Sequence, residues 1–137
     1  PEDAAVRAFA AALHLPSDVA ERLVGTQRRL RGARSPNTLR ALQADLAVWT
    51  AWCRAAGRVP LPARPEHVAA FVDAHALSRA PATVRRYLAS VAALHRAAGL
   101  PDPTKAEEVR LAAAAAARAW AGARAAAGAS TRQRQAA

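Results

Sequence analysis

Two long stretches of this sequence open with a proline and close with a glycine. Between Pro36 and Gly57, the larger apolar residues recur every three or four positions, at Leu39, Leu42, Leu46, Trp49 and Cys53. Between Pro81 and Gly99, the same spacing places on one face Val84, Tyr87, Leu88, Val91, Leu94 and His95. Proline suits the first helical turn, glycine ends helices, and this spacing marks one face of a helix. The two stretches therefore predict two amphipathic helices, the first capped by Ser35.

The remaining segments also favour helices. We expect helices over residues 3–13 and 17–30, from Pro65 onward, and after a capping box formed by Thr104 and Glu107. Alanine contributes 42 of the 137 residues and Val only ten, with no Ile, which suits helices better than a sheet. The sequence thus predicts an all-α fold, a compact bundle of about five to six helices. We expect an N-terminal helical extension over 1–16, the bundle over 17–122, and over 123–137 a flexible tail or the start of a linker.

The charge is strongly basic and unevenly spread. Twenty basic residues face ten acidic ones, giving a net charge of +10, and residues 28–58 alone carry +6. Nineteen of the basic residues are Arg, a preference that GC-rich codon usage can explain, but codon usage does not explain the shortage of acids. Such a surplus favours a polyanionic partner, most often nucleic acid.

The surfaces opposite the two apolar stripes combine small residues with arginine. On the first helix this face holds Asn37, Arg40, Ala44, Ala47, Ala51 and Arg54, with Arg34 just before the cap. On the second it holds Ala82, Arg85, Arg86, Ala89, Ala93 and Arg96. Small residues let the backbone approach a surface closely while guanidinium groups reach outward, which suits a helix in a DNA major groove. An ordinary solvated face is the alternative interpretation.

The sequence offers little support for a catalytic, metal-binding or membrane-spanning function. Cys53 and Tyr87 fall on apolar stripes, and His95 is expected to be a hydrogen-bonded core residue. The four histidines lack metal-ligand spacing, and no Gly-rich phosphate loop is present, so we expect neither metal nor cofactor. One cysteine excludes a disulfide framework, and no apolar run is long enough to span a membrane. We therefore expect a cytoplasmic, non-catalytic chain.

Several segments, in order and spacing, resemble one family. They are the run 35–40, the W-x-x-W-C motif at 49–53, the segment 61–63, the run 81–88, the motif L-H-R-x-x-G-L-P at 94–101, and Pro103-Thr104. Together they resemble the N-terminal core-binding domain of tyrosine recombinases, the phage integrase family. The resemblance covers about Ser17 to Arg118.

The resemblance implies a SAM-like helical bundle that clamps one face of duplex DNA at inverted-repeat sites, alongside other recombinase protomers. It implies DNA contacts at Thr38, Arg40, Ala41, Ala82, Thr83, Arg86, Ser90 and Ala93, although Ala41, Ala82 and Ala93 are shorter than the family's side chains there. The family's catalytic residues lie in a C-terminal domain that is absent from this sequence, and residues 123–137 would be the start of the linker to it. We therefore expect no DNA cleavage by this chain, as a fragment or as a stand-alone module.

Leu111 and Arg118 fall opposite the Val109/Trp120 stripe of the last helix, in a region where the alanine run 112–117 departs from the family. We expect them to contact a neighbouring protomer, unless Leu111 is simply an isolated surface residue.

Combining both lines, the sequence predicts a core-binding domain for DNA recombination or integration in a bacterial, phage or plasmid setting, associated with the nucleoid. The predicted DNA contacts are Arg34, Thr38, Arg40, Ala41, Arg54, Ala82, Thr83, Arg85, Arg86, Ser90, Ala93 and Arg96. The main alternative is a helical interaction module whose basic face docks on an acidic protein. RNA binding is less favoured because the aromatic residues lie on core stripes.

Overall fold

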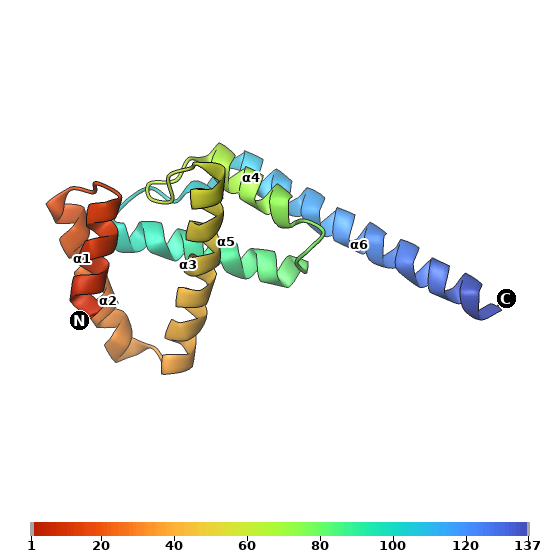
Figure 1. The fold of residues 1–137 in the computed structure, drawn as a ribbon, viewed down its shortest axis with the longest axis horizontal. Coiled ribbons are helices and arrows are strands. Elements are labelled where there is room, and N and C mark those ends of the chain that lie inside the picture. Colours follow the sequence, from red (N-terminus) through yellow and green to blue (C-terminus); the bar gives the residue numbers. More distant parts are fainter. Residues whose placement is uncertain (1, 137) are drawn as a thin grey trace.

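The computed structural model describes residues 2–136, which fold into six α-helices and one short 3-10 turn (Figure 1). In chain order these are α1 (Glu2–Ala12), α2 (Ser17–Ala33), α3 (Pro36–Ala56), α4 (Pro65–His75), α5 (Pro81–Ala98), the turn η1 (Pro103–Lys105) and α6 (Glu107–Ala136). The predicted all-α fold class is confirmed.

Local capping chemistry sets the ends of α3 and α5. The Ser35 hydroxyl accepts a hydrogen bond from the Thr38 backbone N–H at 3.2 Å, and Pro36 is the first helical residue, as predicted. Gly57 ends α3 with φ +67°, and Gly99 ends α5 with φ +71°. Both angles lie in the left-handed region, where a side chain is strained and glycine is not.

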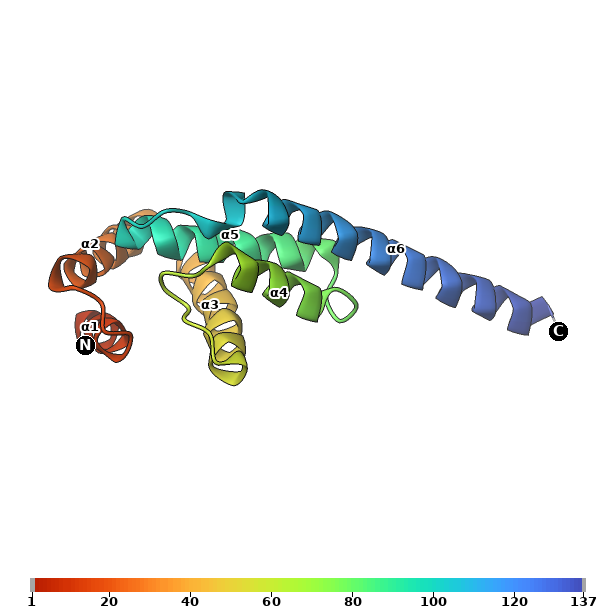
Figure 2. The same ribbon diagram turned by 90° about the horizontal axis from the view of Figure 1, so that it is seen from above.

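Helix α5 occupies the centre of the bundle, because it contacts α2, α3 and α6. Figure 2 shows α6 on one side of α5 and α3 on the other. Helix α1 packs mainly on α2, and α4 packs along α6. This arrangement places the exposed sides of α3 and α5 next to each other, away from most of α6.

The core is built from the predicted apolar stripes. Trp49 is fully buried, its indole N–H donates to the Pro60 carbonyl at 3.1 Å, and its ring meets Phe71 edge-on at 5.1 Å. Cys53 is also fully buried, and Tyr87 is 5% exposed. The predicted core positions of these three residues are confirmed.

The last helix differs from the sequence-based expectation at both ends. Thr104 does not cap α6; instead the Asp102 carboxylate accepts the Thr104 N–H at 2.9 Å and caps η1, and α6 begins at Glu107. Beyond residue 122, where a flexible tail or the start of a linker was expected, α6 continues as a helix to Ala136 and projects from the body (Figures 1 and 2). Alanine and arginine are strong helix formers, and they outweigh Gly122 and Gly128, each of which costs about 1 kcal/mol.

The alanine run 112–117 has a packing role. Ala113 and Ala116 allow α6 to lie close against Val72 of α4 and Val84 of α5, forming a second small apolar cluster. Within residues 2–136, no helix combines the length and apolar character needed to cross a bilayer.

Candidate nucleic-acid interface

The outward side of α3 carries the residues predicted for it. We call this the α3 surface: Asn37, Arg40, Ala44, Ala47, Ala51 and Arg54, all exposed. Arg34, Thr38 and Ala41, at or near the start of the helix, are exposed as well. The guanidinium of Arg40 donates to the side-chain oxygen of Asn37. Since helices rise 1.5 Å per residue, Arg40 and Arg54 lie about 21 Å apart along the axis.

The outward side of α5 is also largely as predicted. We call this the α5 surface: Ala82, Arg85, Arg86, Ala89, Ala93 and Arg96, of which only Ala93 is half-buried. Its arginines do not all face one way. Arg86 reaches toward α3, whereas Arg85 lines a hollow of about 240 Å³ between α5 and the alanine run of α6. Arg85 therefore lies at the edge of any surface that α3 and α5 share.

An ion pair between a buried carboxylate of α3 and an exposed guanidinium of the α5 surface forms where α3 and α5 meet. The Asp45 carboxylate, 2% exposed, accepts hydrogen bonds from Arg86 Nε at 3.1 Å and from Ser90 Oγ at 2.8 Å. Arg86 Nη2 lies 3.0 Å from the same carboxylate. These hydrogen bonds, together with the charge of Asp45, raise the pKa of Arg86. The two arginine-and-alanine surfaces are thus linked directly.

Two predicted contacts take different places. Ser90 is buried and its hydroxyl is engaged by Asp45, so it supports Arg86 from below and is not on the exposed surface. Thr83 is half-buried. Helical periodicity did not reveal the role of Asp45, although Asp45 is the only acid among the seven arginines of residues 28–58.

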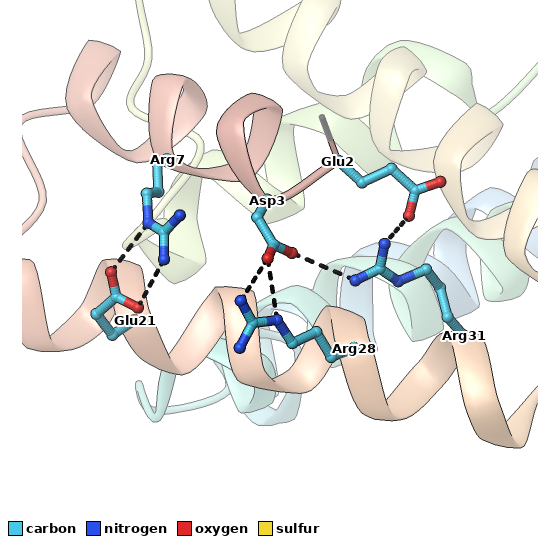
Figure 3. A network of polar contacts seen from close by, with 6 residues as sticks. All are labelled: Glu2, Asp3, Arg7, Glu21, Arg28 and Arg31. Carbon is cyan, nitrogen blue, oxygen red and sulfur yellow. Dashed lines mark hydrogen bonds and ion pairs between the residues drawn. The ribbon is translucent and has the colours of Figure 1, made fainter.

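Helix α1 neutralises part of the basic segment, which local spacing did not reveal. Asp3 accepts from Arg28 Nε at 3.0 Å and from Arg31 at 3.3 Å, and Glu2 also pairs with Arg31 (Figure 3). The bond from Arg28 is the main cause of the lowered pKa of Asp3. Arg28 and Arg31 are therefore paired with α1, whereas Arg29 and Arg34 are exposed and form no ion pair among the described residues.

An apolar groove of about 390 Å³ lies between α1 and α3, with α2 and α5 as its floor. Its apolar lining includes Val6, Phe9, Leu23, Leu30, Leu42, Leu46 and Leu94. Ala47 and Ala93 line it too, so these two alanines form the rim between the groove and the basic surfaces. No local sequence pattern predicts this groove, because its walls come from four separate helices.

Two of the residues considered for chemistry, Cys53 and His95, are buried in the interior. Burial raises the pKa of the Cys53 thiol to about 12, so the thiol is protonated at neutral pH. His95 is fully buried and accepts the Ala63 backbone N–H at Nε2 over 2.9 Å, which confirms the predicted hydrogen-bonded core histidine. Among residues 2–136, no three His, Cys, Asp or Glu side chains gather as a metal site.

Leu111 and Arg118 are exposed on α6. Leu111 is 61% exposed, one of the largest apolar side chains left at the surface of the described residues. Figure 2 shows α6 and α3 on opposite sides of α5, so the helix that carries these two residues lies away from α3.

Comparison with known proteins identifies relatives over this same region. The family described as phage integrase, N-terminal SAM-like domain, matches residues 28–99. The integrase/recombinase xerD homolog of Selenomonas ruminantium is 33% identical over 89 residues, covering 63% of this chain and 26% of that protein. Recombinase cre of Escherichia phage P1 is 34% identical over 84 residues, covering 61% of this chain and 24% of that protein. The chain thus spans about a quarter of the length of these relatives.

Proposed function

Because the chain belongs to the family of phage integrase N-terminal SAM-like domains, we propose that it binds duplex DNA through its α3 and α5 surfaces. The observation that carries this proposal is the ion pair between Asp45 and Arg86, which joins two exposed arginine-and-alanine surfaces at one crossing. Those surfaces carry five arginines with no exposed acid between them. A B-DNA major groove is wide enough to admit a helix.

The proposed contacts divide by chemistry. Arg34, Arg54, Arg85 and Arg96 lie around the crossing and would hold backbone phosphates. Arg40 and Arg86, with Thr38, Thr83 and the small residues Ala41, Ala82 and Ala93, would lie at base edges. Ser90 would act by holding Asp45.

We extend the proposal to the whole protein through its relatives, which are named as recombinases or integrases. The chain would be the DNA-clamping part of a tyrosine recombinase acting on inverted-repeat sites in bacterial cytoplasm, with the catalytic residues in another domain. Leu111 and Arg118, on the separate face of α6, would contact a neighbouring protomer on the DNA.

The test is the salt dependence of binding to a 30-base-pair duplex, followed by fluorescence anisotropy. Four phosphate-neutralising arginines predict a slope of log K against log salt of about −3.6, or roughly a 150-fold loss between 50 and 200 mM NaCl. Arg54→Ala should weaken binding to all duplexes alike and reduce the slope by about 1. Arg110→Ala, which removes an equal charge from an exposed position of α6, should leave the slope unchanged.

A nearly flat salt dependence on DNA would contradict the proposal. Tight binding to polyglutamate, with no binding to duplex DNA, would instead favour the acidic-protein partner.

A further inference from the structure

We propose that Asp45 is a positioning residue that fixes the guanidinium of Arg86 for contact with DNA. The inference rests on the proposed function and names the side chain on which its specificity depends. Asp45 itself is 2% exposed and cannot reach a ligand, whereas the side chain of Arg86 is 58% exposed. The pair therefore has one member inside the protein and one member at its surface.

The geometry leaves one edge of Arg86 open. A guanidinium has five N–H donors in a rigid plane. Asp45 takes the edge formed by Nε, at 3.1 and 3.2 Å from its two oxygens, and Nη2, at 3.0 Å. The opposite edge, formed by Nη1 and the second Nη2 hydrogen, donates to no other described residue. That edge has the spacing for a bidentate bond to a phosphate or to guanine.

Two further contacts restrain this arrangement. Ser90 Oγ donates to Asp45 Oδ2 at 2.8 Å, which orients the carboxylate from below. The Arg86 guanidinium carbon lies 5.8 Å from the centre of the Tyr87 ring, itself 5% exposed. An arginine held in this way loses less rotational freedom on binding than a free surface arginine, so more of its contact energy appears as affinity.

A purely structural role explains these residues less well. An ion pair with a buried carboxylate is an expensive way to hold two helices together, because the lost hydration of Asp45 offsets much of the attraction. Apolar side chains at the same crossing would hold α3 against α5 at least as well. The arrangement is better explained if the exposed guanidinium of Arg86 contacts a ligand.

The direction in which one substitution changes DNA affinity distinguishes the positioning role from a simple charge effect. Asp45→Asn removes a negative charge, which on charge alone would strengthen DNA binding. If Asp45 positions Arg86, the same change should weaken binding to a 30-base-pair duplex, by about tenfold, the lower end of the contribution of one bidentate arginine contact. Asp73→Asn is the matched control, since Asp73 is an exposed carboxylate on α4. It should leave binding equal to or slightly tighter than that of the starting protein.

A double-mutant cycle completes the experiment. In an Arg86→Ala background, Asp45→Asn should cause no further loss of DNA affinity, because the group that it positions is gone. Ser90→Ala, which keeps the ion pair, should weaken binding by a smaller factor and likewise have no effect in the Arg86→Ala background. It serves as the second probe if Asp45→Asn fails to fold, with helical circular dichroism reporting folding.

Three results have distinct meanings. Equal effects of Asp45→Asn and Asp73→Asn on affinity would overturn the positioning role and leave DNA binding intact. Equal losses from Asp45→Asn or Ser90→Ala with and without Arg86 would show that the cluster only supports the fold. Absence of duplex binding by the unsubstituted protein would instead overturn the proposed function itself.

Discussion

His95 offers a quantitative test of how the bundle is held together. Its ring is fully buried between α5 and the loop before α4. Nε2 accepts the Ala63 backbone N–H at 2.9 Å, so Nδ1 carries the proton and donates to the Val91 carbonyl at 2.8 Å. In His95→Leu the Ala63 N–H loses this partner while the apolar volume is largely kept. An unsatisfied buried donor costs about 1–3 kcal/mol, so we expect a loss of about 2 kcal/mol in unfolding free energy.

The pH dependence of stability supplies the second half of this test. Burial lowers the pKa of His95 below its ordinary value of 6.5, because a protonated ring would set an N–H against the Ala63 N–H. As the pH falls through 6.5, His95 takes up a proton in the unfolded chain but stays neutral in the folded chain. The contribution of His95 is therefore full above pH 6.5 and is lost progressively toward the lowered pKa of the folded protein.

Urea unfolding followed by circular dichroism at pH 7.5 and 5.5 measures both effects. His95→Gln, whose side-chain oxygen can accept the Ala63 N–H, should recover part of the loss seen in His95→Leu and show a weaker pH dependence than the starting protein. His14→Gln, at an exposed position, is the control and should change neither quantity. The reasoning fails if His95→Leu is as stable as the starting protein, or if His95→Gln keeps its full pH dependence.

Three further predictions follow from burial and packing. Cys53, with its pKa raised to about 12, should resist iodoacetamide at pH 8 in the folded protein and react readily in 8 M urea; similar rates in the two states would contradict its burial. Combined Glu2→Gln and Asp3→Asn substitution should release α1 from Arg28 and Arg31, so that limited proteolysis cuts residues 13–16 several-fold faster. Glu66→Gln is the control, and equal cleavage rates would show that apolar packing alone holds α1. Removal of residues 123–137 should change the unfolding free energy by less than about 0.5 kcal/mol, since the described side chains there are exposed apart from Gly128. A loss above about 1 kcal/mol in thermal or urea melts would show that this part of α6 packs on the body.

Sequence-based prediction succeeded where the deciding interactions are local. The start of α3 at Pro36, its cap at Ser35 and its end at Gly57 depend on residues within one helical turn of each other. Prediction failed where two local conformations differ by only about 1 kcal/mol in free energy. The predicted capping box at Thr104 does not form, because Asp102 caps η1 instead. Gly122 and Gly128 do not end α6, which is rich in alanine.

The candidate site was predicted in part. Helical periodicity identified the exposed arginines and alanines of α3 and α5, because an apolar stripe also defines the face opposite it. Periodicity did not reveal which arginines point the same way. The family resemblance also implied a DNA contact at Ser90, although Asp45 of another helix draws its hydroxyl inward.

The sequence by itself determined the helices, their buried stripes, the basic surfaces and the family. Each of these depends on residues close together along the chain or on the order of short motifs. Only the tertiary structure decided which charges remain available. Asp45 and Arg86 are 41 positions apart, and Asp3 and Arg28 are 25 apart. The pairing of such residues depends on how whole helices cross and not on spacing within any one of them. The fold thereby commits Arg28 and Arg31 to α1 and presents Arg86, held from beneath, at the surface.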